Sequence, residues 1–321
     1  MPSNQSPLGA LPARFRRERI LIVGCGDVGL RAARVLTGAN AESRAKRPRV
    51  LALTSSPGRH AALRGSGIVP LSGNLDDVAS LRRLAGIATR VLHLAPPPSD
   101  GEKQWWRDPR TQALLNVLKL RVVPAALVYG STSGVYGDCG GARVAESRPA
   151  NPRTPRALRR ADAEHRVRLA GRTTMRTNVL RIPGIYAPDR EGGTPHARLQ
   201  RGTPVLRRED DVFTNHIHAD DLARACVLAL WRGKPQRVLN VNDDTDMRMG
   251  DYFDFVAGLY GMPKPPRVPR SQAEKELSLA MLSFMGESRR MDNTRLKREL
   301  RLALHYPTVR EGLVPLRSPP A

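Results

Sequence analysis

The stretch Arg19-Ile20-Leu21-Ile22-Val23-Gly24-Cys25-Gly26-Asp27-Val28-Gly29 decides the fold of this chain. The apolar run 20–23 predicts a buried strand, and residues 28–36 continue at helical spacing. The glycines between them follow the pattern G-x-G-x-x-G. A glycine lets the backbone approach a diphosphate, and the N-terminus of the following helix offers free N–H groups and the positive end of a dipole. This context favours a dinucleotide-binding turn over a chance glycine-rich loop, with contacts from Gly24, Cys25, Gly26, Asp27, Val28 and Gly29.

Segments of strand and helix character alternate beyond this turn. Strands separated by helix-length segments are typical of a parallel sheet with helices on both faces. We therefore expect an α/β fold with a Rossmann-type, doubly wound parallel sheet and a smaller, mainly helical C-terminal substrate lobe. Predicted strands lie at 50–53, 68–71, 91–94, 126–129, 178–182 and 238–241, and predicted helices at 78–84, 111–120, 149–172 and 220–230.

The domain organisation is predicted from the points at which the regular alternation of strands and helices ends. The N-terminal residues carry Pro, Ser and Arg without an apolar segment, which is typical of a disordered tail. The small lobe is expected over the carboxyl ends of the strands, where open α/β sheets bind ligands. The predicted units are a tail at 1–18, a Rossmann domain at 19–185 completed by about 216–242, and a lobe formed by 186–215 and 243–321.

The charge of the chain is strongly positive, at +23. Of its 53 basic residues 7 are lysines, which leaves 46 arginines. Such an excess is compatible with nucleic-acid binding. However, the arginines are spread along the whole chain, and aromatic residues, which stack on bases, make up only 4%. We favour a compositional origin for the arginines and expect no specific nucleic-acid partner.

The cysteines and the hydropathy indicate a cellular compartment. Cys25, Cys139 and Cys226 lack the paired spacing of a disulfide framework or a zinc site, which fits a reducing environment. No apolar run approaches the length of a membrane span. We expect a cytoplasmic protein without a membrane partner, and we interpret Cys25 as a small packed residue.

Further motifs follow the glycine turn in a fixed order: Gly-Asn-Leu-Asp at 73–76, His-Leu-Ala at 93–95, Ser-Thr-Ser-Gly-Val-Tyr-Gly at 131–137, Leu-Arg-Ile-Pro-Gly-Ile-Tyr at 180–186 and His-Ile-His-Ala-Asp-Asp-Leu-Ala at 216–223. With them the chain resembles the extended or atypical short-chain dehydrogenases/reductases of the NAD(P)-dependent epimerase/dehydratase family, and most of all the bacterial YeeZ-like group. The resemblance runs over about 18–315. It implies a nicotinamide cofactor, a small polar, sugar-like substrate and a homodimer.

The resemblance also implies cofactor contacts outside the glycine turn. Asn74 and Leu75 would lie near the adenine, although the family usually has Asp where Asn74 stands. Leu94, Ala95 and Pro96 would line the cofactor after the strand at 91–94.

The end of the second strand bears on the choice between NAD and NADP. NAD enzymes of this fold usually end that strand with a carboxylate that binds the ribose hydroxyls. Here no carboxylate follows Leu53, and the chain offers Thr54, Ser55 and Arg59 instead. Hydroxyls and a guanidinium suit a 2′-phosphate, so we expect NADP in preference to NAD.

The catalytic residues of the family are only partly present. The resemblance places a catalytic hydroxyl at Thr132, for which a turn-capping role is the alternative. The family's Tyr-x-x-x-Lys pair is replaced by Arg156 and Arg160. A phenol with a lowered pKa can exchange a proton, whereas an arginine stays protonated in proteins. Tyr136 is therefore a candidate substitute acid–base, with packing as the alternative, and Arg160 would still suit a ribose hydroxyl or a phosphate.

Two functions stay open at this point. An NAD(P)-dependent oxidoreductase or epimerase fits the motifs of the substrate lobe. An NADP-binding redox sensor or interaction protein with weak or no catalysis fits the missing Tyr and Lys. Two histidines at 216 and 218, with Asp220, have the spacing of a strand-borne metal motif, because alternate strand residues face one way. No further ligand cluster supports an ion there, and we predict no metal.

Overall fold

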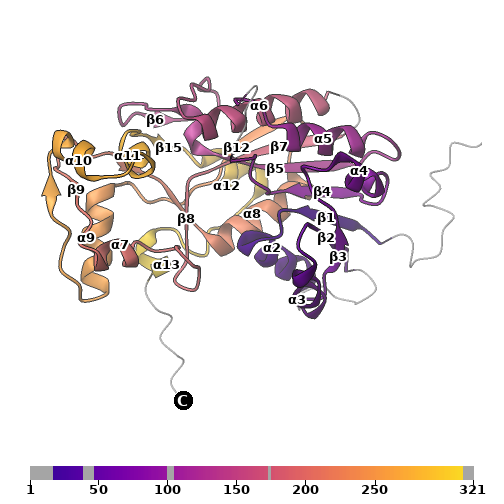
Figure 1. Cartoon of the computed structure of the whole chain (residues 1–321), viewed down its shortest axis with the longest axis horizontal. Helices are drawn as coiled ribbons and strands as arrows, with labels where there is room; N and C mark the ends of the chain where they lie inside the picture. Colours follow the sequence, from indigo (N-terminus) through magenta and orange to yellow (C-terminus); the bar gives the residue numbers. More distant parts are fainter. Residues whose placement is uncertain (1–16, 39–46, 100–104, 173–174, 314–321) are drawn as a thin grey trace, which may run out of the picture.

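A seven-stranded sheet forms the centre of the molecule in the computed structural model, which describes residues 17–38, 47–99, 105–172 and 175–313 (Figure 1). The strand order is β12-β7-β5-β4-β1-β2-β3, and each neighbouring pair is parallel. The chain runs outward from β1 to one edge, returns to β4 and then runs to the other edge. Ligands of such sheets bind where the strand order reverses, at the carboxyl ends of β1 and β4. The predicted doubly wound parallel sheet is confirmed. Most of the predicted tail at 1–18 lies outside the described residues.

The elements of the sheet domain closely follow the predicted segments. Its strands are β1 (Arg19–Val23), β2 (Arg49–Thr54), β3 (Val69–Ser72), β4 (Arg90–His93), β5 (Ala126–Thr132), β7 (Arg176–Ile182) and β12 (Arg237–Asn240). Its helices are α2 (Asp27–Thr37), α3 (His60–Gly65), α4 (Val78–Leu81), α5 (Pro109–Leu118), α6 (Pro155–Ala170), α8 (Ala219–Arg232) and α12 (Thr294–Leu300). Short 3₁₀ turns are η2 (Pro57–Arg59), η3 (Arg82–Leu84) and η4 (Ser133–Tyr136).

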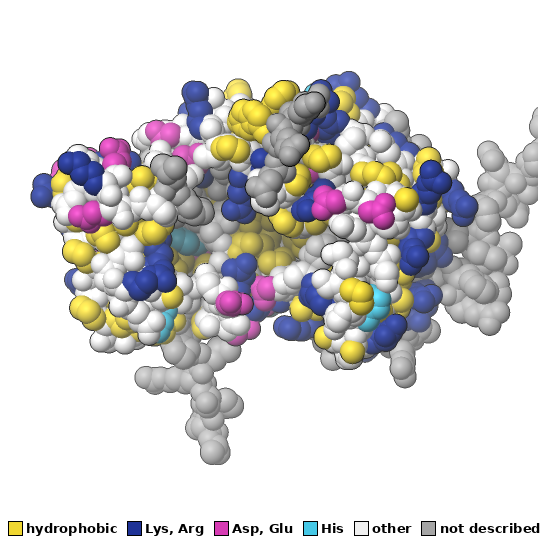
Figure 2. All heavy atoms as spheres, viewed as in Figure 1, with side chains coloured by type: hydrophobic (Ala, Val, Ile, Leu, Met, Phe, Trp, Pro, Cys, Tyr) yellow, Lys and Arg dark blue, Asp and Glu magenta, His cyan; other side chains and the backbone are white. Residues whose placement is uncertain are grey.

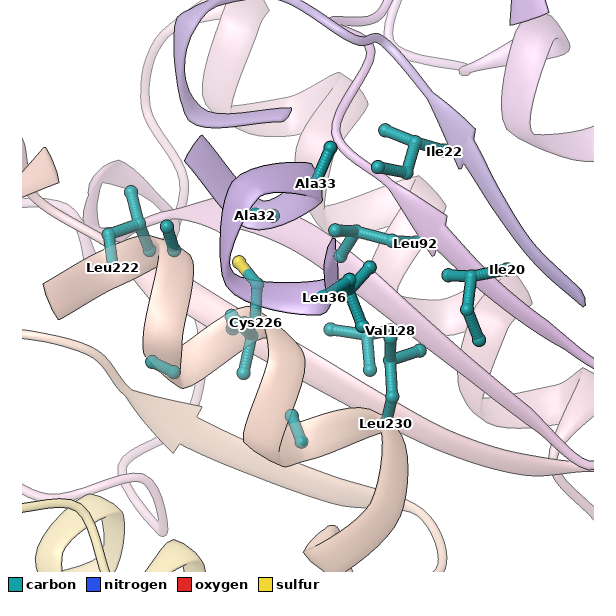
Figure 3. Packing of buried hydrophobic residues seen from close by; sticks show 14 of the residues in the cluster. Ile20, Ile22, Ala32, Ala33, Leu36, Leu92, Val128, Leu222, Cys226 and Leu230 are labelled. Carbon is teal, nitrogen blue, oxygen red and sulfur yellow. The ribbon is translucent and has the colours of Figure 1, made fainter. Parts of the chain in front are cut away.

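Two apolar layers enclose the sheet, because successive side chains of a strand point to opposite faces. Ile20 and Ile22 of β1 belong to the layer under α2 and α8, where they pack with Leu36 and Leu230 (Figure 3). Leu21 and Val23 belong to the other layer, under α5 and α6. Both layers are closed to water, so burial fixes the register of β1 and the position of the glycine turn that follows it.

The smaller lobe lies beyond the carboxyl ends of the strands (Figure 1). Phe253 and Val256 are at the centre of its own apolar core. Its helices are α7 (His196–Gln200), α9 (Met249–Leu259), α10 (Arg270–Glu276), α11 (Leu279–Met285) and α13 (Val309–Leu313). Paired short strands connect its loops: β6 (Arg143–Val144) with β15 (Arg290–Met291), β8 (Gly184–Tyr186) with β11 (His216–His218), β9 (Val205–Leu206) with β14 (Arg267–Val268), and β10 (Phe213–Thr214) with β13 (Met247–Arg248).

Helix α12 lies apart from the rest of this C-terminal region. Although it falls within the range 243–321 that was assigned to the lobe, its Leu296 and Leu300 are fully buried in the layer with α2 and α8. The chain therefore returns to the sheet domain after α11. The division into a Rossmann domain and a lobe at the proposed boundaries stays a prediction.

A buried guanidinium joins the two parts at the glycine turn. Arg31 of α2 is 5% exposed and forms ion pairs with Asp27 at 3.0 Å, Asp189 at 2.8 Å and Asp220 at 2.6 Å. Asp189 belongs to the segment after β8, and Asp220 to the first turn of α8. Arg190 adds a second contact with Asp27, at 3.1 Å. The glycine turn and the segment entering the lobe are thus held together electrostatically.

Candidate active site

The three glycines of the turn have three different surroundings. Gly24 has φ +87°, and a Cβ on it would lie 2.3 Å from the Ala95 nitrogen. A Cβ on Gly29 would lie 3.1 Å from the Gly24 carbonyl oxygen, whereas one on Gly26 would meet no atom within 4 Å. Gly24 and Gly29 therefore permit close packing of the turn, and Gly26 borders open space. That space fits the diphosphate of a dinucleotide, which must approach the backbone here.

A cavity of about 360 Å³ lies beside this turn, at the carboxyl ends of β1, β2 and β4. The structure brings most of the predicted cofactor residues together in its wall: Gly24, Cys25, Gly26, Thr54, Ser55, Arg59, Asn74, Leu75, Leu94, Ala95 and Pro96. Asp27, Val28 and Gly29 lie in the first turn of α2, behind the wall. Ser56, Gly73 and Arg110 also line the cavity. Sequence reasoning missed these three residues, because their position depends on how the loops fold over the sheet.

Arg59 bridges the end of β2 to the glycine turn. One of its Nη atoms donates to the carbonyl oxygen of Cys25 at 2.7 Å, which holds the guanidinium at the cavity wall. Burial raises the pKa of the neighbouring Cys25 thiol to about 11, so the uncharged thiol is favoured at neutral pH. Arg59 thus places a positive charge at this end of the cavity, beside the hydroxyls of Thr54 and Ser55.

A second, larger cavity of about 860 Å³ adjoins the first and shares Pro96 and Arg110 with it. It lies between the sheet domain and the smaller lobe, where Figure 2 shows the surface hollowed, with hydrophobic side chains at the base. Thr132 and Arg156 line it from the end of β5 and the start of α6. The lobe contributes Phe213, Asn215, Met249, Glu287 and Arg289.

Thr132 is half-buried at the junction of β5 and the turn η4. Its Oγ1 accepts a hydrogen bond from the Gly134 nitrogen at 3.3 Å, the turn-capping geometry foreseen as the alternative. A hydroxyl oxygen has two lone pairs and one proton, so this bond leaves the O–H free to donate into the cavity. Capping and a role toward substrate are therefore compatible for this residue.

Tyr136 and Arg160 lie outside both cavities. The Tyr136 ring is 1% exposed, and its hydroxyl donates to Asn240 Oδ1 at 2.7 Å. Arg160 is 6% exposed and donates from Nη1 to the Tyr129 hydroxyl at 3.1 Å and to the Gly130 carbonyl at 2.5 Å. Burial raises the pKa of Tyr136 above its ordinary value. Both side chains thus have partners inside the protein.

Arg159 is a further residue of the larger cavity that sequence reasoning missed. It is 7% exposed and donates to three backbone carbonyls, those of Pro98, Ser99 and Trp105, at 2.6–2.8 Å. These bonds fasten the segment after β4 onto α6 and shape one wall of the cavity. Its spacing from Arg156 places it about one helical turn farther along α6, and this was the only signal in the sequence.

The two histidines of β11 both contact the ring of Tyr186, and each has a further aromatic neighbour. The ring of His216 stacks on Tyr252 at 4.3 Å, and the ring of His218 stacks on Tyr306 at 3.7 Å. His218 Nδ1 also accepts a hydrogen bond from the Asp220 nitrogen and so caps α8. No group of three or more potential metal ligands occurs within the part of the chain that the structure describes.

The sheet topology and the glycine turn define a Rossmann-like α/β fold, with two adjoining cavities at the carboxyl ends of its strands. A family model described as the NAD dependent epimerase/dehydratase family matches residues 20–242, and the chain belongs to this family. A search of curated proteins found no match. No helix among the described residues is long and apolar enough to cross a membrane.

Solved structures similar to this chain support the fold over nearly its whole length. A conserved protein of unknown function from Silicibacter pomeroyi is 27% identical, with 92% of this chain and 96% of that chain covered and a TM-score of 0.73. A nucleoside-diphosphate-sugar epimerase from Pseudomonas aeruginosa is 17% identical, with coverages of 92% and 94% and a TM-score of 0.74. A UDP-glucuronic acid 4-epimerase from Bacillus cereus, in complex with NAD, is 19% identical, with coverages of 91% and 94% and a TM-score of 0.67.

Proposed function

We propose that this protein is an NAD(P)-dependent oxidoreductase or epimerase that acts on a small polar, sugar-like substrate in the larger cavity. The observation that carries the proposal is the junction of the two cavities at Pro96 and Arg110. A dinucleotide whose diphosphate lies at Gly26 would extend past Ala95 toward Thr132. When bound, the cofactor supplies hydride transfer. Thr132 would orient a substrate oxygen by donating its hydroxyl proton.

We propose NADP(H) as the preferred cofactor. The end of β2 carries Thr54 and Ser55 without a carboxylate, so no acidic group is there to repel a 2′-phosphate. Arg59 is already held at this wall by its bond to Cys25. A guanidinium that is preorganised in this way loses little side-chain entropy when it binds a phosphate.

The residues at the start of α6 support a second candidate function. We propose that Arg156 and Arg160 occupy the positions of the family's Tyr and Lys. Neither can serve as a proton relay, since arginine stays protonated. Tyr136, buried and bonded to Asn240, is then a packing residue. An NADP-binding redox sensor or interaction protein with weak or no catalysis is the alternative that this replacement favours.

Three finer assignments complete the proposal. The YeeZ-like subgroup rests on the ordered set of motifs at 24–29, 73–76, 93–95, 131–137, 180–186 and 216–223. A cytoplasmic location fits the three buried free cysteines. A homodimer fits the apolar Leu120 and Leu169, which are 65% and 42% exposed near the C-terminal ends of α5 and α6.

Calorimetric titrations with NADPH and NADH test the cofactor assignment. We expect NADPH to bind more tightly than NADH, at raised as well as low salt, because general attraction of a positive surface is screened by salt. Gly26→Val places a branched side chain where the diphosphate must approach, so it should weaken binding by more than about tenfold. Circular dichroism controls for folding of the variant. Unchanged affinity in folded Gly26→Val, or tighter binding of NADH by the wild type, would contradict the proposal.

A further inference from the structure

The start of α6 concentrates positive charge without acidic partners. Arg156, Arg159 and Arg160 lie within little more than one helical turn. Among the described residues, no carboxylate lies within 4 Å of any of their guanidinium nitrogens, although ion pairs are frequent elsewhere in the chain. Arg159 and Arg160 bond only to neutral oxygens. Arg156 forms no hydrogen bond within the described structure and lines the larger cavity.

Other groups do little to offset this charge. Asp108 interacts electrostatically with Arg160, but its carboxyl oxygens accept hydrogen bonds from Thr111 and form no ion pair with the described guanidinium groups of α6. Glu287 is the only acidic residue among those lining the cavity, and it forms an ion pair with Arg289 at 2.7 Å. Arg110, at the other end, is paired with Asp76 at 2.6 Å. Among the described arginines that line the cavity, Arg156 is therefore the one with neither a hydrogen bond nor an ion pair.

The surroundings of Arg156 strengthen its need for an anion. Arg156 is solvent-exposed where it lines the cavity, and the charge of Arg160 lies beside it. Thr154, Pro155 and Ala157 line the same wall, so the positive end of the α6 dipole also faces the cavity. A bound oxyanion would relieve the repulsion and interact favourably with the dipole.

We propose that the second molecule carries a carboxylate, which binds Arg156 at the α6 end of the larger cavity, on the same wall as Thr132. This assignment rests on the proposed function. A planar guanidinium with free donors matches a carboxylate through two parallel hydrogen bonds. A phosphate dianion calls for more donors than the single fork of Arg156, because Arg159 Nε and Nη1 and Arg160 Nη1 already donate to protein oxygens, and the unpaired Arg160 Nε is buried outside this cavity. The substrate class is therefore a small polar organic acid, with its acid group beside the reacting end.

Binding of malonate by isothermal titration calorimetry tests this site without requiring turnover. Malonate should bind the wild type, and Arg156→Gln should weaken it roughly 10- to 100-fold, the effect of losing charge-assisted hydrogen bonds. Arg156→Lys keeps the charge but loses the fork, so its affinity should be intermediate. Arg168→Gln is the matched control, because it makes the same charge change on an exposed residue of α6 outside this cavity.

Several outcomes would overturn the assignment. These are equal malonate affinity in wild type and Arg156→Gln, equal losses in Arg156→Gln and Arg168→Gln, or malonamide binding as tightly as malonate. If inorganic phosphate binds more tightly than malonate and this binding depends on Arg156, the ligand group of the site is a phosphate and not a carboxylate. NADPH titrations on the same proteins distinguish the failure of the cofactor proposal from the failure of the carboxylate proposal. A protein that binds malonate but not NADPH would contradict the cofactor site alone.

Discussion

At the scale of single residues, the glycine turn was predictable because its residues are adjacent in sequence and each has a local task. The candidate cofactor residues on separate strands also line one cavity, because parallel strands end at one edge of the sheet. Arg110 and Arg159 were not, because their positions depend on α5 and α6 packing over loops that are distant in sequence. Thr132 illustrates the limit: its turn bond and its place in the cavity are visible only in three dimensions.

Replacement of Thr132 separates chemistry from packing. Thr132→Val removes the hydroxyl with little change in volume. With a substrate that supports hydride transfer, followed by nicotinamide absorbance, kcat should fall by about 10²-fold, the scale of a positioned donor. Thr132→Ser should retain most activity. Tyr136→Phe should lower the melting temperature and leave kcat nearly unchanged, because its hydroxyl is bonded to Asn240 outside the cavity. Robust turnover in Thr132→Val would remove Thr132 from the proposed mechanism.

At the scale of elements, the long strands and helices were predictable from their hydrophobic periodicity. The apolar runs of β1 and β4 are buried on both faces, as in other parallel sheets. The two-residue strands of the lobe were not predicted, since pairs such as β9 with β14 form only after distant segments meet. The position of α12 in the sheet domain was missed for the same reason, because its amphipathic pattern does not specify which apolar layer it joins.

The stability of the contact between β11 and the segment after β12, which Asp243 forms, should depend on pH. The Asp243 nitrogen donates to the His216 carbonyl at 2.8 Å, and its Oδ1 accepts from the Thr245 nitrogen at 2.9 Å. Burial raises the pKa of this carboxyl from 3.8 to about 7. The native state therefore favours the protonated form. The stabilising contribution is complete below the unfolded-state pKa of 3.8 and is lost progressively as pH rises from 3.8 to about 7.

Asp243→Asn imitates the protonated carboxyl and can keep the bond to Thr245. The variant should melt at a slightly higher temperature than the wild type near pH 5, and this difference should be larger near pH 8. The gap should be on the order of a few degrees. Asp244→Asn controls for a nearby charge change in an exposed residue. A gap that does not change between the two pH values would show that Asp243 does not titrate in this range.

At the scale of the whole molecule, the arginine excess is partly structural. Arg31, Arg181, Arg237 and Arg267 each bind carboxylates of other elements, and Arg159 binds backbone carbonyls. Lysine could not replace most of these bonds, because it lacks the planar fork of donors. In the view of Figure 2 the basic side chains are scattered among other types. The fold therefore uses arginine to join segments that are distant in sequence, which the composition alone did not reveal.

This distribution predicts weak and unselective binding of nucleic acids. Fluorescence anisotropy with labelled duplexes of unrelated sequence should give similar affinities. Each affinity should fall steeply between about 50 and 200 mM salt, because binding of this kind is driven by the release of counterions from phosphates. Arginines that are paired with carboxylates within the protein are not available to phosphates, so the slope should be much smaller than the number of basic residues, 53, suggests. One defined sequence bound tightly at physiological salt, well above the other duplexes, would instead make nucleic-acid recognition the function of this surface.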